Sequence, residues 1–111
     1  MVRIDLDRLP QIRREIRSLV GRIRRTLHVE RVLLFGSFAT GHIHEGSDVD
    51  VLIVGPFHER FHLRAGRIWD LIDPERYIPV EPICYTPDEF AQLRHEGNPF
   101  LRHILRHAVE L

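Results

Sequence analysis

Two aspartates separated by one residue are the part of this sequence best suited to chemistry. Asp48 and Asp50 open a segment, residues 48–54, that alternates at first and then becomes wholly apolar, so it reads as a strand. Side chains two residues apart in a strand point to the same face, with Cα atoms about 6.6 to 6.8 Å apart. Neighbouring carboxylates repel unless a cation joins them, and Mg²⁺ prefers such oxygen ligands together with phosphate oxygens. The pair therefore predicts a site for magnesium and a triphosphate.

A glycine-serine turn precedes this strand in the chain. Residues 29–35 are mostly β-branched or apolar and end at Gly36-Ser37, as expected for a buried strand that enters a tight turn. The backbone N–H groups of the turn and the Ser37 hydroxyl can face a phosphate, and Gly36 allows close approach and a positive φ. A polar loop, residues 41–46, then returns the chain to Asp48. We therefore expect the phosphate-binding turn and the carboxylates to lie together.

The remaining segments predict helices and one further strand. Apolar residues recur at helical spacing over about 8–27, 58–72 and 99–108, and Thr86-Pro87-Asp88-Glu89 is the capping box of a helix that ends near Gly97. Trp69 falls on the apolar stripe of the second of these helices, which predicts that it packs in the core. Residues 77–85 read as a strand, which its two prolines predict to be an edge strand or an irregular one. The predicted fold is α/β (α+β), a small mixed sheet flanked by helices, in a single domain over residues 1–111.

The bulk composition excludes several classes of protein. Of the 111 residues, 43% are hydrophobic and 29% charged, which is ordinary for one globular domain. The formal net charge is zero, so we do not expect direct nucleic-acid binding, and the absence of lysine excludes a P-loop. The sequence has neither a membrane-spanning apolar run nor a signal-peptide pattern, and we expect a cytoplasmic location and no membrane partner. The single cysteine, Cys84, lies in an apolar run and is expected to be buried.

The segment from Gly36 to Val54, GSFATGHIHEGSDVDVLIV, resembles the signature of the DNA polymerase beta nucleotidyltransferases. Gly-Ser, a spacer of about ten residues and then Asp-x-Asp all match, and the pattern is similar to the minimal nucleotidyltransferase (MNT) branch. The resemblance implies a polymerase beta-like fold. It also implies that Gly36, Ser37 and Ser47 contact the nucleotide, while Asp48 and Asp50 hold magnesium and are catalytic.

The same family uses a third carboxylate on the next strand, and the residue in that place here is Glu81, between Val80 and Pro82. The family usually has aspartate there. Glutamate is longer by one methylene, so it can still reach a metal ion or accept the proton of an acceptor, although with a different geometry. A second departure is Thr40, which stands where the family often carries an arginine. The resemblance therefore implies a catalytic and metal-binding triad of Asp48, Asp50 and Glu81.

Resemblance to the MNT branch also implies a function. Such chains hold only the catalytic core, and in prokaryotes they are typically encoded beside a small helical HEPN protein in what resembles a toxin–antitoxin module. Some of these antitoxins transfer AMP from ATP to a tyrosine of the toxin, and this is the predicted activity. Two alternatives stay open: an antitoxin that inhibits its partner by occlusion with little catalysis, and a nucleotidyltransferase for a small molecule or an RNA end. A homodimer is also compatible with the apolar stripe of the last helix.

Overall fold

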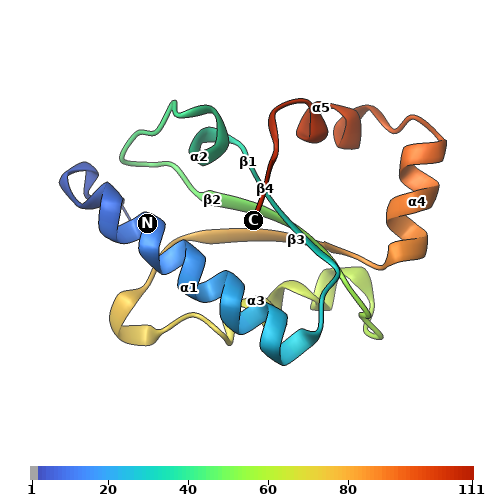
Figure 1. Ribbon diagram of the computed structural model, residues 1–111, viewed down its shortest axis with the longest axis horizontal. Coiled ribbons are helices and arrows are strands. Elements are labelled where there is room, and N and C mark those ends of the chain that lie inside the picture. The colour runs from blue at the N-terminus through green and yellow to red at the C-terminus, as the bar shows by residue number, and fades with distance from the viewer. Residues whose placement is uncertain (1–2) are drawn as a thin grey trace.

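The structure is a computed structural model that describes residues 3–111 (Figure 1). In chain order its elements are the 3₁₀ turn η1 (Leu6–Arg8), α1 (Leu9–Leu27), β1 (Arg31–Phe35), α2 (Ser37–Thr40), β2 (Val49–Val54), η2 (Phe61–Leu63), α3 (Ala65–Trp69), η3 (Pro74–Arg76), β3 (Val80–Tyr85), α4 (Pro87–His95), α5 (Pro99–His107) and β4 (Val109–Glu110). The architecture is mixed α+β, which confirms the predicted fold class.

The four strands form one mixed sheet in the order β3-β2-β1-β4. β1 and β2 are antiparallel, as expected for strands joined by the short α2 and a loop, whereas β2 and β3 are parallel and are joined by the crossover that contains α3. β3 lies at the edge of the sheet and carries Pro82 within its length, so the predicted edge position is confirmed. β2, which carries Asp50, is therefore paired on both sides.

Each face of the sheet carries its own apolar core. Val49, Val51 and Ile53 of β2 belong to a larger core that includes the buried residues of α1 and α3. Leu52 and Val54 belong to a smaller core with the buried residues of α4 and α5. Figure 1 shows α1 and α3 below the sheet and α5 above it. Because side chains alternate along a strand, Asp50 points to the same side as Leu52, which is the face that α4 and α5 cover.

The first helix supplies much of the larger core. α1 has 19 residues, and its buried stripe consists of Ile16, Leu19, Val20, Ile23 and Leu27. Burial of each such side chain stabilises the fold by about 1.5 to 3 kcal/mol. The helix ends at His28, which adopts the left-handed conformation with φ of 53° and bonds back to Arg24. The helix predicted over residues 8–27 is confirmed.

The continuous helix predicted over residues 58–72 is wrong. Only η2 and the five-residue α3 form there. The Arg64 side chain bonds the backbone oxygen of Glu59 at 3.0 Å, an oxygen that a continuous helix would use internally, and Gly66 lowers the helix propensity that remains. The core position predicted for Trp69 is also wrong. Its side chain is 49% exposed, and its indole N–H donates to the Val80 carbonyl at 2.9 Å.

The two C-terminal helices begin where the sequence predicts. Thr86 and Glu89 form both halves of a capping box at α4, and the Asn98 side chain accepts from the Leu101 amide at α5. After α5 the chain forms β4, which pairs antiparallel with β1 and which the sequence did not predict. Two residues are too few to give a periodic signal. Residues 3–111 contain no helix with the length and apolarity that crossing a bilayer requires.

Candidate active site

Pairing of three strands brings two of the predicted carboxylates side by side. Asp50 of β2 is in register with Glu81 of parallel β3 and with Phe35 of antiparallel β1. Paired strands are about 4.8 Å apart, and residues in register present their side chains on the same face. Asp50 is therefore flanked by a carboxylate on one side and by an aromatic ring on the other. The sequence contained no signal for this register.

The third carboxylate, Asp48, lies just before β2. The peptide between the two aspartates is fixed, because the Val49 N–H donates to the Pro79 carbonyl at 2.7 Å and the Val49 side chain is buried. Asp48 and Glu81 are exposed, whereas Asp50 is half-buried. The site thus has one constrained carboxylate at its centre and two carboxylates with freedom to rotate beside it.

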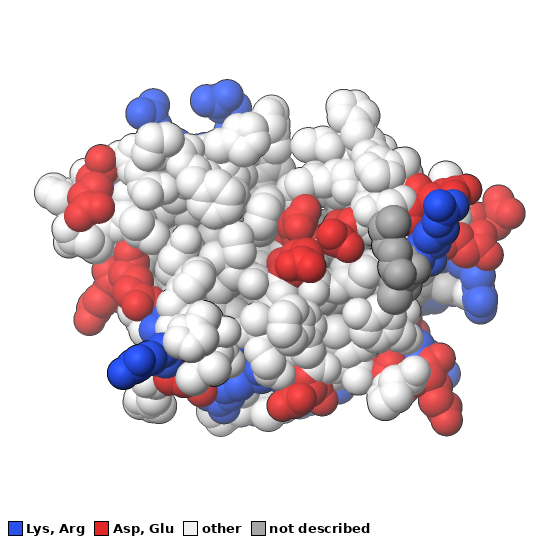
Figure 2. Space-filling view, turned by 180° about the vertical axis from the view of Figure 1, so that it is seen from behind, with Lys and Arg blue, Asp and Glu red and all other residues white. Residues whose placement is uncertain are grey.

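Burial and the neighbouring carboxylates shift the pKa of Asp50. It is raised from 3.8 to about 6, first by burial of the carboxylate and then by the negative charges of Asp48 and Glu81. Within residues 3–111, no arginine or histidine forms a salt bridge with any of the three carboxylates. Figure 2 shows a group of acidic side chains near the middle of the rear face, bordered mainly by uncharged residues. No basic side chain of the described chain therefore stands close enough to pair with the cluster.

Gly36 gives room to the central carboxylate. Its φ of 70° and ψ of −152° are open to glycine and strained for other residues, which confirms the predicted positive φ. A Cβ at this position would fall on Oδ2 of Asp50 and lie 3.1 Å from its Cγ. The turn and the carboxylate therefore touch, as the sequence predicts. Glycine is needed here for the fit of Asp50 as well as for any approach of a phosphate.

The two predicted serines occupy different environments. Ser37 begins the four-residue α2 and is half-buried, and the N–H groups at the start of a helix have no partner within it. Ser47 is 4% exposed, and its hydroxyl oxygen accepts from the His44 N–H at 2.9 Å while its own N–H donates to the His44 carbonyl. Ser47 thus closes the loop that delivers Asp48. Contact of either serine with a nucleotide stays a prediction.

The donor set fits magnesium in its chemistry. Three carboxylates supply oxygen ligands, and the unbalanced negative charge favours a divalent cation. As their side chains stand, however, residues 3–111 contain no assembled group of three His, Cys, Asp or Glu ligands. Asp48 and Glu81 are exposed, so we expect them to turn toward Asp50 when a cation arrives.

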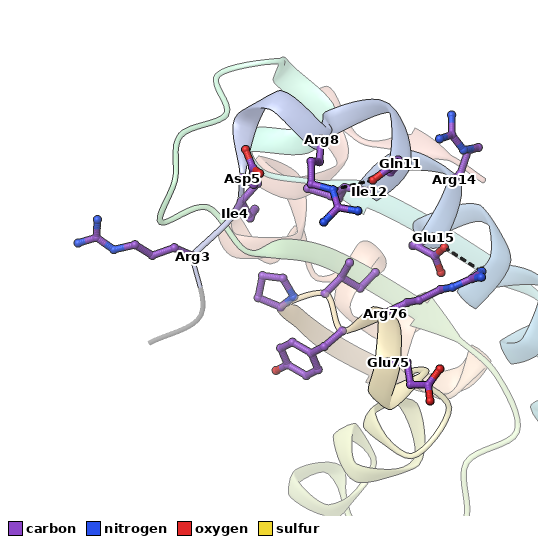
Figure 3. Close-up of a pocket in the computed structure, with 13 residues that line it drawn as sticks. Arg3, Ile4, Asp5, Arg8, Gln11, Ile12, Arg14, Glu15, Glu75 and Arg76 are labelled. Carbon is purple, nitrogen blue, oxygen red and sulfur yellow. Dashed lines mark hydrogen bonds and ion pairs between the residues drawn. The ribbon is translucent and has the colours of Figure 1, made fainter.

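A cavity of about 550 Å³ lies at the same end of the sheet but is lined by none of the six predicted residues (Figure 3). It lies between the start of α1 and the segment 75–79. Arg8 bonds Gln11 at 2.7 Å there, and Arg76 pairs with Glu15 at 3.5 Å. One wall is Pro79, whose carbonyl holds the peptide between the two aspartates. Sequence reasoning missed this cavity, because it forms between segments more than sixty residues apart.

Comparison with known proteins places the chain in a family. The family model described as a nucleotidyltransferase domain matches residues 9–106, a span that includes all six predicted site residues. This chain belongs to that family. The fold of the nucleotidyltransferase domain is similar to that of a candidate nucleotidyltransferase from Sulfolobus solfataricus, with a TM-score of 0.56 and 24% sequence identity over 74% of this chain and 75% of the other. No curated protein matches the chain.

Membership of this family identifies the class of reaction, nucleotidyl transfer, but not its substrates. Enzymes of this class transfer a nucleotidyl group to an acceptor, and a cluster of carboxylates beside a glycine turn suits that reaction. The fold and the nucleotidyltransferase family are thereby confirmed, whereas the MNT branch, the nucleotide, the metal and the acceptor stay predictions.

Proposed function

We propose that this chain transfers AMP from Mg-ATP to a hydroxyl acceptor, a tyrosine of a HEPN-type helical toxin, and that it acts as the antitoxin. The observation that carries the proposal is the row formed by Asp48, Asp50 and Glu81 beside the Gly36 turn. These groups lie on one face of the sheet and lack a counter-charge within the described chain.

Each residue has a role in the proposed reaction. The backbone of the Gly36-Ser37 turn binds the triphosphate, and Asp48 and Asp50 hold magnesium, which when bound neutralises phosphate charge and the leaving group. Glu81 completes this ligand set and accepts the proton of the acceptor hydroxyl. The acceptor oxygen forms a bond to the α-phosphorus as the α–β phosphoanhydride bond breaks, and pyrophosphate leaves.

The decisive experiment measures the intact mass of the helical partner after incubation with this chain and Mg-ATP. We expect the mass of AMP to be added by the wild-type chain, and Glu81→Gln to abolish the addition while Mg-ATP binding persists. Glu81→Asp, which restores the usual residue of the family, should retain activity. Glu30→Gln is the matched control, because Glu30 is exposed at the opposite end of the sheet, where its N–H bonds Val54.

A second function, inhibition of the partner by occlusion without transfer of AMP, has one observation in its favour. Glu81 is exposed and stands where the family usually has aspartate, and Thr40 replaces an arginine of the family, so catalysis has fewer of its usual groups. A chain that silences its partner without adding AMP, and whose Asp48→Asn, Asp50→Asn variant silences it equally well, acts by occlusion. That result would overturn the transferase proposal for this chain.

A further inference from the structure

α4 and α5 enclose a groove on the surface of the molecule, with a volume of about 400 Å³. Its floor is apolar and is formed by Leu93 of α4 with Leu101 and Leu105 of α5. Leu101 is fully buried and also belongs to the smaller core, whereas the other two leucines are half-buried. The groove thus presents unfilled apolar surface directly over the core that supports it.

The rim of the groove is positively charged. Arg94, Arg102 and Arg106 line it, and all three are exposed. In the described part of the chain no acidic group forms a salt bridge with these three arginines. The guanidinium group of Arg94 lies over the Phe90 ring. Because the formal net charge of the chain is zero, this basic rim is a local feature and not a general property of the surface.

The spacing of these residues matches the spacing of a helix. Leu101 and Leu105 are four residues apart on α5, as are Arg102 and Arg106, so each pair lies one helical turn apart along the same helix. A partner helix packed along α5 presents side chains on one face at the same four-residue interval. Apolar residues at i and i+4 would fill the floor, and acidic residues at the flanking i and i+4 positions would reach both arginines.

The groove lies on the same side of the sheet as the carboxylates. α5 packs against β1, and its buried residues share a core with Leu33 of β1 and with Leu52 and Val54 of β2. Asp50 points to that same side from near the start of β2. A protein seated on α4 and α5 would therefore extend over the face that carries the proposed site. An RNA is a poorer fit, because the floor is apolar and no aromatic side chain lines the groove for base stacking.

We propose that the groove between α4 and α5 binds an acidic amphipathic helix of a partner protein. This inference rests on the proposed function only for the role of that partner, which is to carry the acceptor hydroxyl. The leucines of the groove supply the apolar contact, and the three arginines select acidic helices over basic ones and set their orientation.

The test uses a designed helical peptide of about five turns, with leucines at i and i+4 on one face and glutamates beside them. Its binding to the full chain is measured by fluorescence anisotropy, and its position is mapped by amide chemical shifts. We expect shifts confined to α4 and α5, and at least tenfold weaker binding for the same peptide with lysine in place of glutamate. Arg102→Glu with Arg106→Glu should also weaken the glutamate peptide at least tenfold. Arg17→Glu with Arg25→Glu, the matched reversal of two exposed arginines on α1, should not.

Three outcomes would overturn the proposal. These are the absence of peptide binding at millimolar concentration, equal binding of the lysine peptide, and shifts in α4 and α5 caused by a single-stranded RNA but not by the peptide. Mg-ATP affinity is measured on the same variants and should be unchanged by reversal of Arg102 and Arg106. Asp48→Asn with Asp50→Asn should lose Mg-ATP and keep the peptide, so failure of the groove and failure of the proposed active site are distinguishable.

Discussion

Replacement of Gly36 by alanine tests the contact between the glycine turn and the central carboxylate. The backbone at Gly36, with φ of 70° and ψ of −152°, costs a residue with a side chain about 1 to 3 kcal/mol. The new Cβ would also fall on Oδ2 of Asp50, and displacement of that side chain from its rotamer adds about 1 kcal/mol. We expect Gly36→Ala to lower the free energy of unfolding by about 2 to 4 kcal/mol and to weaken Mg-ATP binding.

A second glycine with a positive φ serves as a control that lacks the steric contact. Gly97 has φ of 68°, close to that of Gly36, but a Cβ there would have no atom within 4 Å. Gly97→Ala should therefore cost only the left-handed conformation, about 1 to 2 kcal/mol, and leave nucleotide affinity unchanged. Urea unfolding followed by the fluorescence of Trp69, together with calorimetry of Mg-ATP binding, measures both effects.

A double-mutant cycle makes the argument refutable. Asp50→Ala removes the atom that the new Cβ would meet, so Gly36→Ala should cost about 1 kcal/mol less in that background than in the wild-type chain. A contact between Gly36 and Asp50 is contradicted if Gly36→Ala lowers the free energy of unfolding no more than Gly97→Ala does. It is also contradicted if the effects of Gly36→Ala and Asp50→Ala on that free energy are additive, because residues in contact are expected to couple.

Two further predictions follow from the charges of the fold. Because the folded state raises the pKa of Asp50 from 3.8 to about 6, it binds the proton more tightly than the unfolded chain; without magnesium, stability should fall as pH rises from 4 to 6 and then level off. Screening of this half-exposed group reduces the loss to about 1 to 2 kcal/mol, and Asp50→Asn should remove it in urea unfolding at a series of pH values. Arg64 is buried and bonds Glu89 and the Cys84 carbonyl, so Arg64→Met should cost about 3 kcal/mol. The exposed Arg3, which pairs with Glu45, is the control, and Arg3→Met should change stability by less than about 0.5 kcal/mol; equal losses for the two arginines would contradict this ranking.

The parts of the fold that the sequence predicted are those with local causes. The caps at Thr86 and Asn98 depend on residues three apart, and the apolar run of β2 depends on burial of a central strand, so both could be read without tertiary information. Burial of Cys84 followed in the same way, and burial raises the pKa of its thiol to about 12. The prediction of a helix over residues 58–72 failed because of Arg64, which lies within that segment. Glu89 holds the Arg64 side chain in a position from which it bonds the backbone oxygen of Glu59.

In the candidate site, too, features with local causes could be predicted, whereas features that depend on pairing between strands could not. The identity and common face of Asp48 and Asp50 followed from strand geometry, and the family resemblance added Glu81. The register that sets Glu81 beside Asp50 arises from pairing between strands and had no sequence signal. The contact of Gly36 with Asp50, in contrast, follows the predicted proximity of the turn and the carboxylates. The groove of α4 and α5 and the cavity beside Pro79 were missed for a related reason, since each forms between separate elements.

The negative charges of the three carboxylates also determine which ligands the site favours. Within the described chain the three carboxylates have no ion-pair partner, so the fold is less stable once Asp50 is ionised, at pH 6 and above, than it is at pH 4. A divalent cation that binds the folded chain alone restores that stability by mass action and competes with the proton on Asp50. A nucleotide that brings its own magnesium is therefore favoured over an uncharged ligand of the same shape. The acidic helix proposed for the groove is repelled by the charged carboxylates and less so once they are neutralised, so partner binding should tighten when Mg-ATP is present.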